Sequence, residues 1–264
     1  MTYQAAIDEF KLSAISGVSK EQLIRFYQDE YNFTDDDIAA IIKESEFRKK
    51  PLFVNYFQLY NLKIPATAKK LKYPFTQIYL QENFLEEDHC QEIMEEMEQH
   101  LHPSYVSNAD DRLIVSEYRT SSSADFDYKY TRLGTDLDFK ISRYLKIDPF
   151  LGESIQGQKY KPGEFYKEHY DWYTPFTPEY KTYTEWMGQR SWTFMIYLNE
   201  VEEGGETYFK HLNLKVKPKP GLAIFWNNLY INGWPNYKTL HEALPPVSGD
   251  KYIITKWFRS WPML

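Results

Sequence analysis

Two histidines and one aspartate have the residue types and the spacing of a metal site. His169 and Asp171 are separated by one residue, and His241 follows 72 positions after His169. Alternate side chains of a strand point to one face, so an imidazole and a carboxylate at a strand end can converge on one point. A second imidazole would complete a facial set of two nitrogens and one oxygen, which leaves three adjacent coordination positions open, as non-haem iron(II) oxygenases require. The bare pattern is frequent by chance, so it needs support from other residues.

The segment after His241 supplies that support. Lys251 lies ten residues further on, at the end of the stretch HEALPPVSGDK. With the His169–Asp171 pair, these motifs make residues 74–262 similar to the 2-oxoglutarate/Fe(II) dioxygenases of the prolyl 4-hydroxylase family. The resemblance implies iron(II) held by His169, Asp171 and His241, with 2-oxoglutarate and dioxygen in the open positions. It also implies ascorbate as the reductant that keeps the iron in its reduced state.

The resemblance assigns three further residues to 2-oxoglutarate. Lys251 would lie on the strand after that of His241, antiparallel to it and pointing into the barrel, where it binds the distal carboxylate of 2-oxoglutarate. A buried lysine without a partner is costly, and a carboxylate relieves that cost. Tyr160 and Thr207 occupy positions at which the family supplies hydroxyl donors to the same molecule. The alternative is an exposed lysine and two polar groups of the core.

Substrate contacts are also implied by the resemblance. Tyr166, Arg190 and Trp257 match the tyrosine, arginine and tryptophan that contact the prolyl peptide in the family. An aromatic face suits a pyrrolidine ring, and an arginine can donate to a peptide carbonyl. The alternative is aromatic packing and a structural ion pair. The aromatic-rich loop 175–186 borders the expected substrate entrance, and it departs from the family pattern by being slightly long.

The spacing of apolar residues predicts a β-rich domain with flanking helices. Short strands separated by turns favour a closed or double-sheet architecture, and the resemblance makes it a double-stranded β-helix, or jelly-roll. An acidic helix is expected from about Glu86, and a second helix over 127–145. The motif Arg119-Thr120-Ser121-Ser122 would precede that second helix and suits its N-terminal turn, and we assign it no chemistry. The expected strands cover 75–79, 154–160, 164–170, 192–198, 208–209, 221–226, 238–242 and 251–258.

The first 73 residues are expected to form a helical segment and a connector, which divides the chain into residues 1–73 and the dioxygenase domain 74–264. Ser19 with Gln22 gives a capping-box pattern, and Thr34 precedes three aspartates that would lie in the first turn of a second helix. We interpret this segment as a helical cap on the catalytic domain, with a docking surface for a substrate or partner as the alternative.

Composition excludes several classes of protein. The 264 residues carry 38 acidic and 31 basic side chains, a net charge of −7, which argues against a general nucleic-acid binder. The single cysteine, Cys90, can form neither an internal disulfide nor a zinc site. No apolar run has the length of a membrane span, and no signal peptide is recognisable, so a cytoplasmic protein is expected.

Prolyl hydroxylation of a protein or peptide, with release of succinate and CO2, is therefore the leading hypothesis. Hydroxylation of a free amino acid or another small molecule by the same chemistry is the alternative within the enzymes. A binding module that senses 2-oxoglutarate or metal without turnover is the alternative from another class.

Overall fold

The structure is a computed structural model, and it describes residues 54–107, 113–114, 117–126, 132–184 and 187–261, together with Gln28, Thr34, Asp36 and Ala39. The helices expected over residues 1–50 lie almost entirely outside these ranges. Fourteen strands form an eight-stranded sheet, a four-stranded sheet and a short two-stranded ribbon. Strand bounds are β1 (Lys69–Lys70), β2 (Ile78–Gln81), β3 (His102–Pro103), β4 (Val106–Ser107), β5 (Leu113–Ile114), β6 (Ser122–Phe126), β7 (Ile155–Tyr160), β8 (Tyr166–His169), β9 (Arg190–Tyr197), β10 (Thr207–Phe209), β11 (Leu214–Val216), β12 (Ala223–Asn227), β13 (His241–Ala243) and β14 (Lys251–Arg259).

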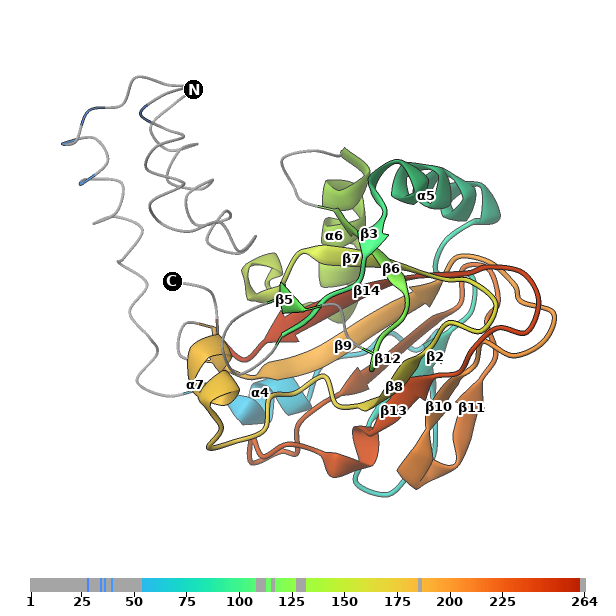
Figure 1. Ribbon diagram of the computed structural model, residues 1–264. Helices are drawn as coiled ribbons and strands as arrows, with labels where there is room; N and C mark the ends of the chain where they lie inside the picture. The colour runs from blue at the N-terminus through green and yellow to red at the C-terminus, as the bar shows by residue number, and fades with distance from the viewer. Residues whose placement is uncertain are drawn as a thin grey trace.

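The helices are few and short. Helical bounds are α4 (Tyr56–Tyr60), α5 (Glu87–His100), α6 (Arg132–Leu145), α7 (Pro178–Thr184) and the 3-10 turns η1 (Pro149–Leu151), η2 (Lys210–Leu212) and η3 (Tyr237–Thr239). The acidic helix begins where the sequence predicts it, with Glu87 and Asp88 in its first turn, where the helix dipole favours negative charge. Figure 1 shows α5 and α6 together on one side of the large sheet, away from the four-stranded sheet.

The two main sheets confirm the predicted jelly-roll architecture. The strand orders are β1-β2-β12-β9-β14-β7-β6-β3 and β11-β10-β13-β8, and neighbouring strands are antiparallel. Successive side chains of β9 point to opposite faces of the large sheet, so this strand contributes to two hydrophobic cores, one on each face. Trp192, Phe194 and Ile196 pack against the helices, whereas Met195 and Tyr197 face the space between the sheets.

The connector before the domain contributes to this fold. Strand β1 pairs with β2 at the edge of the large sheet, and the Trp192 indole donates a hydrogen bond to the Leu59 carbonyl at 2.8 Å. These contacts place residues 59–70 against the sheet, while the division of the chain between residues 73 and 74 stays a prediction.

One local expectation is wrong. The serines of the Arg119-Thr120-Ser121-Ser122 motif do not start a helix, because Ser122 begins strand β6. Ser121 and Ser123 are buried instead, and each accepts a hydrogen bond from Arg119. An arginine two and four residues upstream of these serines can replace the backbone of a helix as the partner of their hydroxyls, and the serine pattern alone cannot separate the two cases.

Candidate active site

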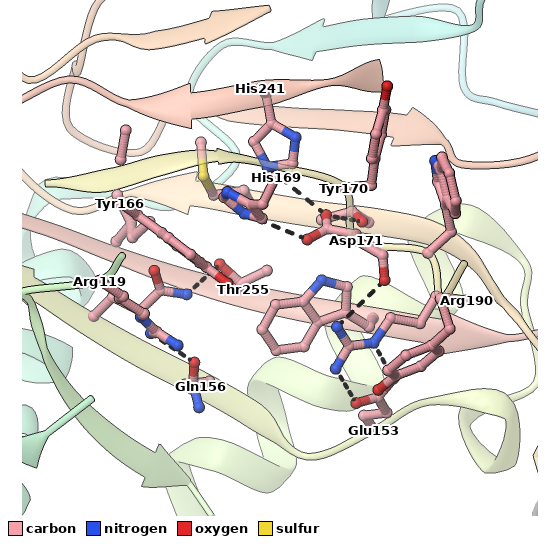
Figure 2. Close-up of a pocket in the computed structure, with 18 of the residues that line it drawn as sticks. Arg119, Glu153, Gln156, Tyr166, His169, Tyr170, Asp171, Arg190, His241 and Thr255 are labelled. Carbon is pink, nitrogen blue, oxygen red and sulfur yellow. Dashed lines mark hydrogen bonds and ion pairs between the residues drawn. The ribbon is translucent and has the colours of Figure 1, made fainter. Parts of the chain in front are cut away.

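The four-stranded sheet brings the two histidines together. Strands β8 and β13 are neighbours, and His169 pairs directly with His241 across them, which places the two ring centroids 4.3 Å apart. Asp171 lies two residues beyond His169, just past the end of β8. His169 Nε2 is 3.8 Å from Asp171 Oδ1, and His241 Nε2 is 4.0 Å from Asp171 Oδ2. One ligand atom from each residue falls within 4.8 Å of the others, so the three predicted ligands are close enough to share one ion (Figure 2).

Hydrogen bonds fix which imidazole nitrogen is free. His169 Nδ1 lies 2.8 Å from the Lys167 carbonyl, and His241 Nδ1 lies 2.9 Å from the Thr239 carbonyl. A carbonyl only accepts, so each Nδ1 carries the proton and each Nε2 keeps its lone pair for a ligand bond.

Protonation in the cluster also suits a metal. Burial and, to a smaller extent, the neighbouring His241 lower the pKa of His169 to about 3, while Asp171 opposes the change. Burial acts to raise the pKa of Asp171, but the two histidines and Arg190 outweigh it and hold that pKa below its usual range. A neutral imidazole beside an ionised carboxylate is the state in which these groups bind a divalent ion.

A chain of buried hydrogen bonds orients the aspartate. Thr193 Oγ1 donates to Asp171 Oδ2 at 2.6 Å, Asn228 Nδ2 donates to Thr193 Oγ1 at 2.8 Å, and Trp226 Nε1 donates to Asn228 Oδ1 at 2.9 Å. All four side chains are at most 5% exposed. Partners of this kind hold a ligand in one orientation. Sequence reasoning missed this chain, because its members lie in apolar runs and in a loop.

Lys251 lies at the base of the site, in the opposite sheet. Its strand, β14, is the next strand after β13, but β14 pairs with β7 and β9 rather than with β13. The Lys251 strand is the next strand, as expected, but it does not pair with the His241 strand, because the segment 244–250 crosses from one sheet to the other. The inward direction is right: Lys251 pairs with Tyr160 in register, and its Nζ lies 5.0 Å from the Tyr160 ring centroid.

The Lys251 ammonium has no hydrogen-bond partner among the described residues, and its side chain is 0% exposed. Burial lowers its pKa to about 7, with partial opposition from Glu206. A buried cation without a counter-charge is costly, so an anion that enters the space between the sheets gains a strong partner. This orphaned ammonium, opposite three metal donors, fits an anionic co-substrate that also binds the metal.

Tyr160 and Thr207 line the cavity near this lysine. The Tyr160 hydroxyl donates to Gln158 Oε1 at 2.7 Å, and burial raises the pKa of Tyr160 to about 12. Thr207 Oγ1 accepts from the Tyr197 hydroxyl at 2.8 Å. Both are neutral donors at physiological pH. Their direct contact with a co-substrate stays a prediction, and Tyr197 is an additional polar neighbour that sequence reasoning counted only as part of an apolar run.

The cavity between the sheets has a volume of about 740 Å³ and contains all three predicted metal ligands in its wall. The predicted substrate residues Tyr166, Arg190 and Trp257 also line it. The Tyr166 ring stacks on His169, with ring centroids 3.6 Å apart and planes 13° from parallel. Tyr166 therefore packs against a predicted metal ligand, whatever else it contacts.

Arg190 forms a buried ion pair. Its Nε and Nη2 donate to the two carboxylate oxygens of Glu153 at 2.6 and 2.7 Å, and Arg259 contributes a second guanidinium 2.7 Å from Glu153. Burial alone would raise the pKa of Glu153, but the two arginines lower it to about 2. The Arg190 guanidinium lies over the Trp257 ring, 4.3 Å from its centroid, so arginine and tryptophan form one unit of the cavity wall (Figure 2).

Arg119 is a cavity residue to which sequence analysis assigned no chemistry. Its Nη2 donates to Gln156 Oε1 at 2.9 Å, and its guanidinium covers the face of Tyr166 that is turned toward it, 5.1 Å from the ring centroid. Gln156 and Gln158 alternate with Gly157 on β7, and both line the cavity. This period-two placement of glutamines on a buried strand is the signal that could have identified this polar wall.

Comparison with known proteins agrees with this geometry. The family model of the 2OG-Fe(II) oxygenase superfamily matches residues 155–259. Prolyl 4-hydroxylase subunit alpha-3 of Mus musculus is 35% identical over 187 residues, which are 70% of this chain and 34% of the relative. A putative prolyl 4-hydroxylase of Acanthamoeba polyphaga mimivirus is 30% identical over 200 residues, which cover 75% of this chain and 81% of that protein.

Among solved structures, the 2OG complex of viral collagen prolyl hydroxylase from Paramecium Bursaria Chlorella virus-1 superposes with a TM-score of 0.54 at 27% identity, over 69% of this chain and 95% of that one. The chain spans about a third of the length of the alpha-3 subunits that it matches. Within the described ranges, no helix has both the length and the apolar character of a membrane span. The matched relatives, the jelly-roll and the two-histidine, one-carboxylate cluster agree, and the chain belongs to the prolyl 4-hydroxylase family of the 2OG-Fe(II) oxygenase superfamily.

Proposed function

We propose that the chain hydroxylates prolyl residues of a polypeptide, with Fe(II), dioxygen and 2-oxoglutarate. The single observation that carries the proposal is the orphaned Lys251 ammonium between the sheets, opposite the cluster of His169, Asp171 and His241. Iron(II) held there supplies oxidative chemistry in which 2-oxoglutarate leaves as succinate and CO2 and one oxygen atom enters a C–H bond of the substrate.

The chain's own residues have separate tasks in this reaction. His169, Asp171 and His241 would hold the metal through one donor atom each and leave its remaining positions to other ligands. Lys251 binds the distal carboxylate of 2-oxoglutarate, and Tyr160 and Thr207 offer hydroxyl groups to the same molecule. Lys251 is fully buried against the rings of Tyr160 and Tyr197, so the lysine–carboxylate bond forms in a medium of low dielectric constant, where it is strong.

Tyr166, Arg190 and Trp257 are proposed to position the prolyl substrate. Trp257 presents an aromatic ring to the cavity, which suits a pyrrolidine ring. Arg190 uses Nε and Nη2 for Glu153, and its Nη1 makes only a 3.4 Å contact with the Asp171 carbonyl. A substrate carbonyl could therefore receive a better bond from Nη1 without breaking the ion pair. Ascorbate as reductant and a cytoplasmic location belong to the same proposal.

Mass spectrometry tests the proposal directly. The purified chain is incubated with Fe(II), 2-oxoglutarate, ascorbate and a library of proline-containing peptides, and the products are searched for the mass of one added oxygen atom on proline. His241→Ala is the matched control, and its circular dichroism should equal that of the wild type. We expect hydroxyproline and an equal amount of succinate from the wild type only. Hydroxylation of a free amino acid in the absence of any peptide product would contradict the proposal.

A further inference from the structure

An exposed aromatic surface adjoins the mouth of the cavity. It consists of Phe75, Ile231, Trp234 and Tyr237, which are 77%, 48%, 55% and 54% exposed. Three of these residues belong to the loop between β12 and β13, which covers residues 228–240, and Phe75 belongs to the turn before β2. We call these four side chains the aromatic surface. Scattered apolar residues are normal on proteins, whereas grouped aromatic residues mark interaction sites.

Hydrogen bonds hold the two segments together. Lys238 Nζ donates to the Pro74 carbonyl at 3.2 Å and lies 5.7 Å from the Phe75 ring centroid. Asn236 Nδ2 donates to the Phe75 carbonyl at 3.4 Å, and the Asn236 side chain also accepts from the Lys238 amide at 3.1 Å. Within the loop, the Tyr230 amide donates to the Trp234 carbonyl at 2.8 Å. The surface is therefore built before any ligand binds, which lowers the entropic cost of binding.

The aromatic surface is continuous with the cavity. Trp172 lines the cavity, and its indole nitrogen donates to the Asn236 carbonyl in the loop at 3.3 Å. Tyr170 also lines the cavity and stacks on Trp172 with ring centroids 4.2 Å apart. Figure 2 shows Tyr170 beside the metal ligand His241, which follows the loop directly. A chain that leaves the metal centre on this side passes from Tyr170 and Trp172 onto the loop.

The two segments that form the aromatic surface are basic, although the whole protein has a negative net charge. The net charge is −7, yet the segments 69–76 and 228–240 contain four lysines, Lys69, Lys70, Lys72 and Lys238, and no acidic residue. A groove of about 450 Å³, lined by residues 70–74, lies next to Phe75 in the chain. An acidic ligand would be attracted to this region of a protein that is negatively charged as a whole.

We propose that the aromatic surface and its lysines form a second binding site for the polypeptide substrate, which takes an extended, acidic, proline-containing segment outside the reacting residue. The proposal rests on the proposed prolyl hydroxylation. Exposed rings bind pyrrolidine rings of extended segments, and the lysines select acidic neighbours. Continuity with the cavity favours one polypeptide that occupies both sites over a separate ligand such as single-stranded RNA, for which stacked rings and lysines would also be suitable.

Paired peptides test the proposal. One peptide contains only the reacting proline and its nearest neighbours, and the other extends the same core on both sides with proline and glutamate. We expect the wild type to have a lower KM for the long peptide. Trp234→Ala and Phe75→Ala should raise that KM about tenfold, as expected for the loss of one aromatic anchor, and change the KM of the short peptide much less. Lys238→Glu should also raise the KM of the long peptide, and this increase should disappear at high salt.

Matched controls come from helix α6 on the other side of the large sheet. Phe139 is an exposed aromatic residue there and Lys140 is its neighbour, so Phe139→Ala and Lys140→Glu should leave the KM of the long peptide unchanged. Equal KM values for the two peptides in the wild type, or an equal response to both sets of variants, would overturn the proposal.

Direct binding separates this site from the proposed function. Fluorescence anisotropy of the labelled long peptide is measured without turnover. If no peptide is hydroxylated but binding occurs and is lost in Trp234→Ala, the aromatic surface is supported and the proposed reaction fails. If the peptide is hydroxylated and Trp234→Ala binds it as tightly as the wild type, the aromatic surface fails alone. Binding of a labelled RNA oligonucleotide in place of the peptide, lost in Trp234→Ala, would also overturn the polypeptide assignment.

Discussion

Replacement of Lys251 by methionine should stabilise the ligand-free protein by an amount that falls as pH rises. The ordinary pKa of a lysine is 10.5, and burial lowers that of Lys251 to about 7. The unfolded chain therefore binds the proton more tightly than the folded chain. At 1.36 kcal/mol per pKa unit, the buried ammonium costs about 5 kcal/mol at pH 6, where both states are protonated. At pH 9 the folded lysine is neutral, and the remaining cost is about 2 kcal/mol.

Urea unfolding of the wild type and of Lys251→Met at pH 6 and pH 9 measures this difference. Methionine is unbranched like lysine and one atom shorter, and the packing effects of the substitution are similar at both pH values and cancel in the comparison. The stability gained by Lys251→Met should be about 3 kcal/mol larger at pH 6 than at pH 9. If Lys251→Met changes the free energy of unfolding equally at pH 6 and pH 9, the charge on buried Lys251 does not destabilise the protein. The structural reason for an anion beside Lys251 would then be lost.

Protonation of Lys251 destabilises the ligand-free protein, but it should favour binding of 2-oxoglutarate. Binding of 2-oxoglutarate requires the protonated lysine, so its apparent affinity should fall as pH rises above about 7, roughly fivefold from pH 7 to pH 8. Titration of the iron-loaded protein with 2-oxoglutarate at each pH measures the trend. Lys251→Met should bind 2-oxoglutarate weakly at every pH, and a Lys251→Met protein with wild-type affinity would move the anion site elsewhere.

Three further predictions concern the cavity wall. Asp171→Glu should abolish turnover while the melting temperature stays close to that of the wild type, because the added methylene displaces a ligand that tolerates little error; retained activity would contradict the assigned ligand set. Thr193→Val should weaken iron binding about tenfold, because the 2.6 Å hydrogen bond to Asp171 is lost, and Thr193→Ser should restore the affinity. If Thr193→Val and Thr193→Ser bind iron equally well, Thr193 is a packing residue. Arg190→Ala should destabilise the fold by about 3 kcal/mol in urea unfolding, because Glu153 stays buried and keeps only the Arg259 guanidinium as an ion-pair partner. Adding Glu153→Gln to this variant should restore part of the lost stability. If stability does not recover, Arg190→Ala removes packing rather than charge compensation.

Much of the fold follows from local patterns in the sequence. The continuous apolar run of residues 192–198 predicts a strand that is covered on both faces, and Trp192 and Met195 do pack on opposite sides of β9. The metal ligands are equally local, since His169 and Asp171 share one strand end and only His241 must be brought from a distance. Residues with fixed spacing in one family motif are therefore the part of this site that a sequence predicts well.

Residues that act through distant partners are the part that local patterns miss. Arg119 and Gln156 are 37 positions apart, and although Gln156 and Gln158 indicate a polar face on β7, nothing next to Arg119 in the sequence indicates that it pairs with that face. Glu153 and Arg190 are also 37 positions apart, so the sequence left an ion pair and a substrate contact as open alternatives for Arg190. The pairing of β6 with β7 brings Arg119 close to Gln156, and the pairing of β14 with β7 and β9 brings the segment before β7 close to Arg190.

Two lysines on one strand show why burial must be combined with pairing. Lys251 and Lys256 both lie on β14, and both are 0% exposed. Their five-residue separation places them on opposite faces of the large sheet, because side chains alternate along a strand. Lys256 faces α6, where it forms a salt bridge with Asp138 and a hydrogen bond with the Glu153 carbonyl. Its charge is compensated inside the protein, so it fits a structural role. Lys251 faces the space between the sheets and has no hydrogen-bond partner in the part of the chain that the structure describes, so an anion that enters from outside would offset the cost of its burial. The unpaired lysine, rather than the buried lysine in general, is therefore the residue on this strand that indicates a ligand.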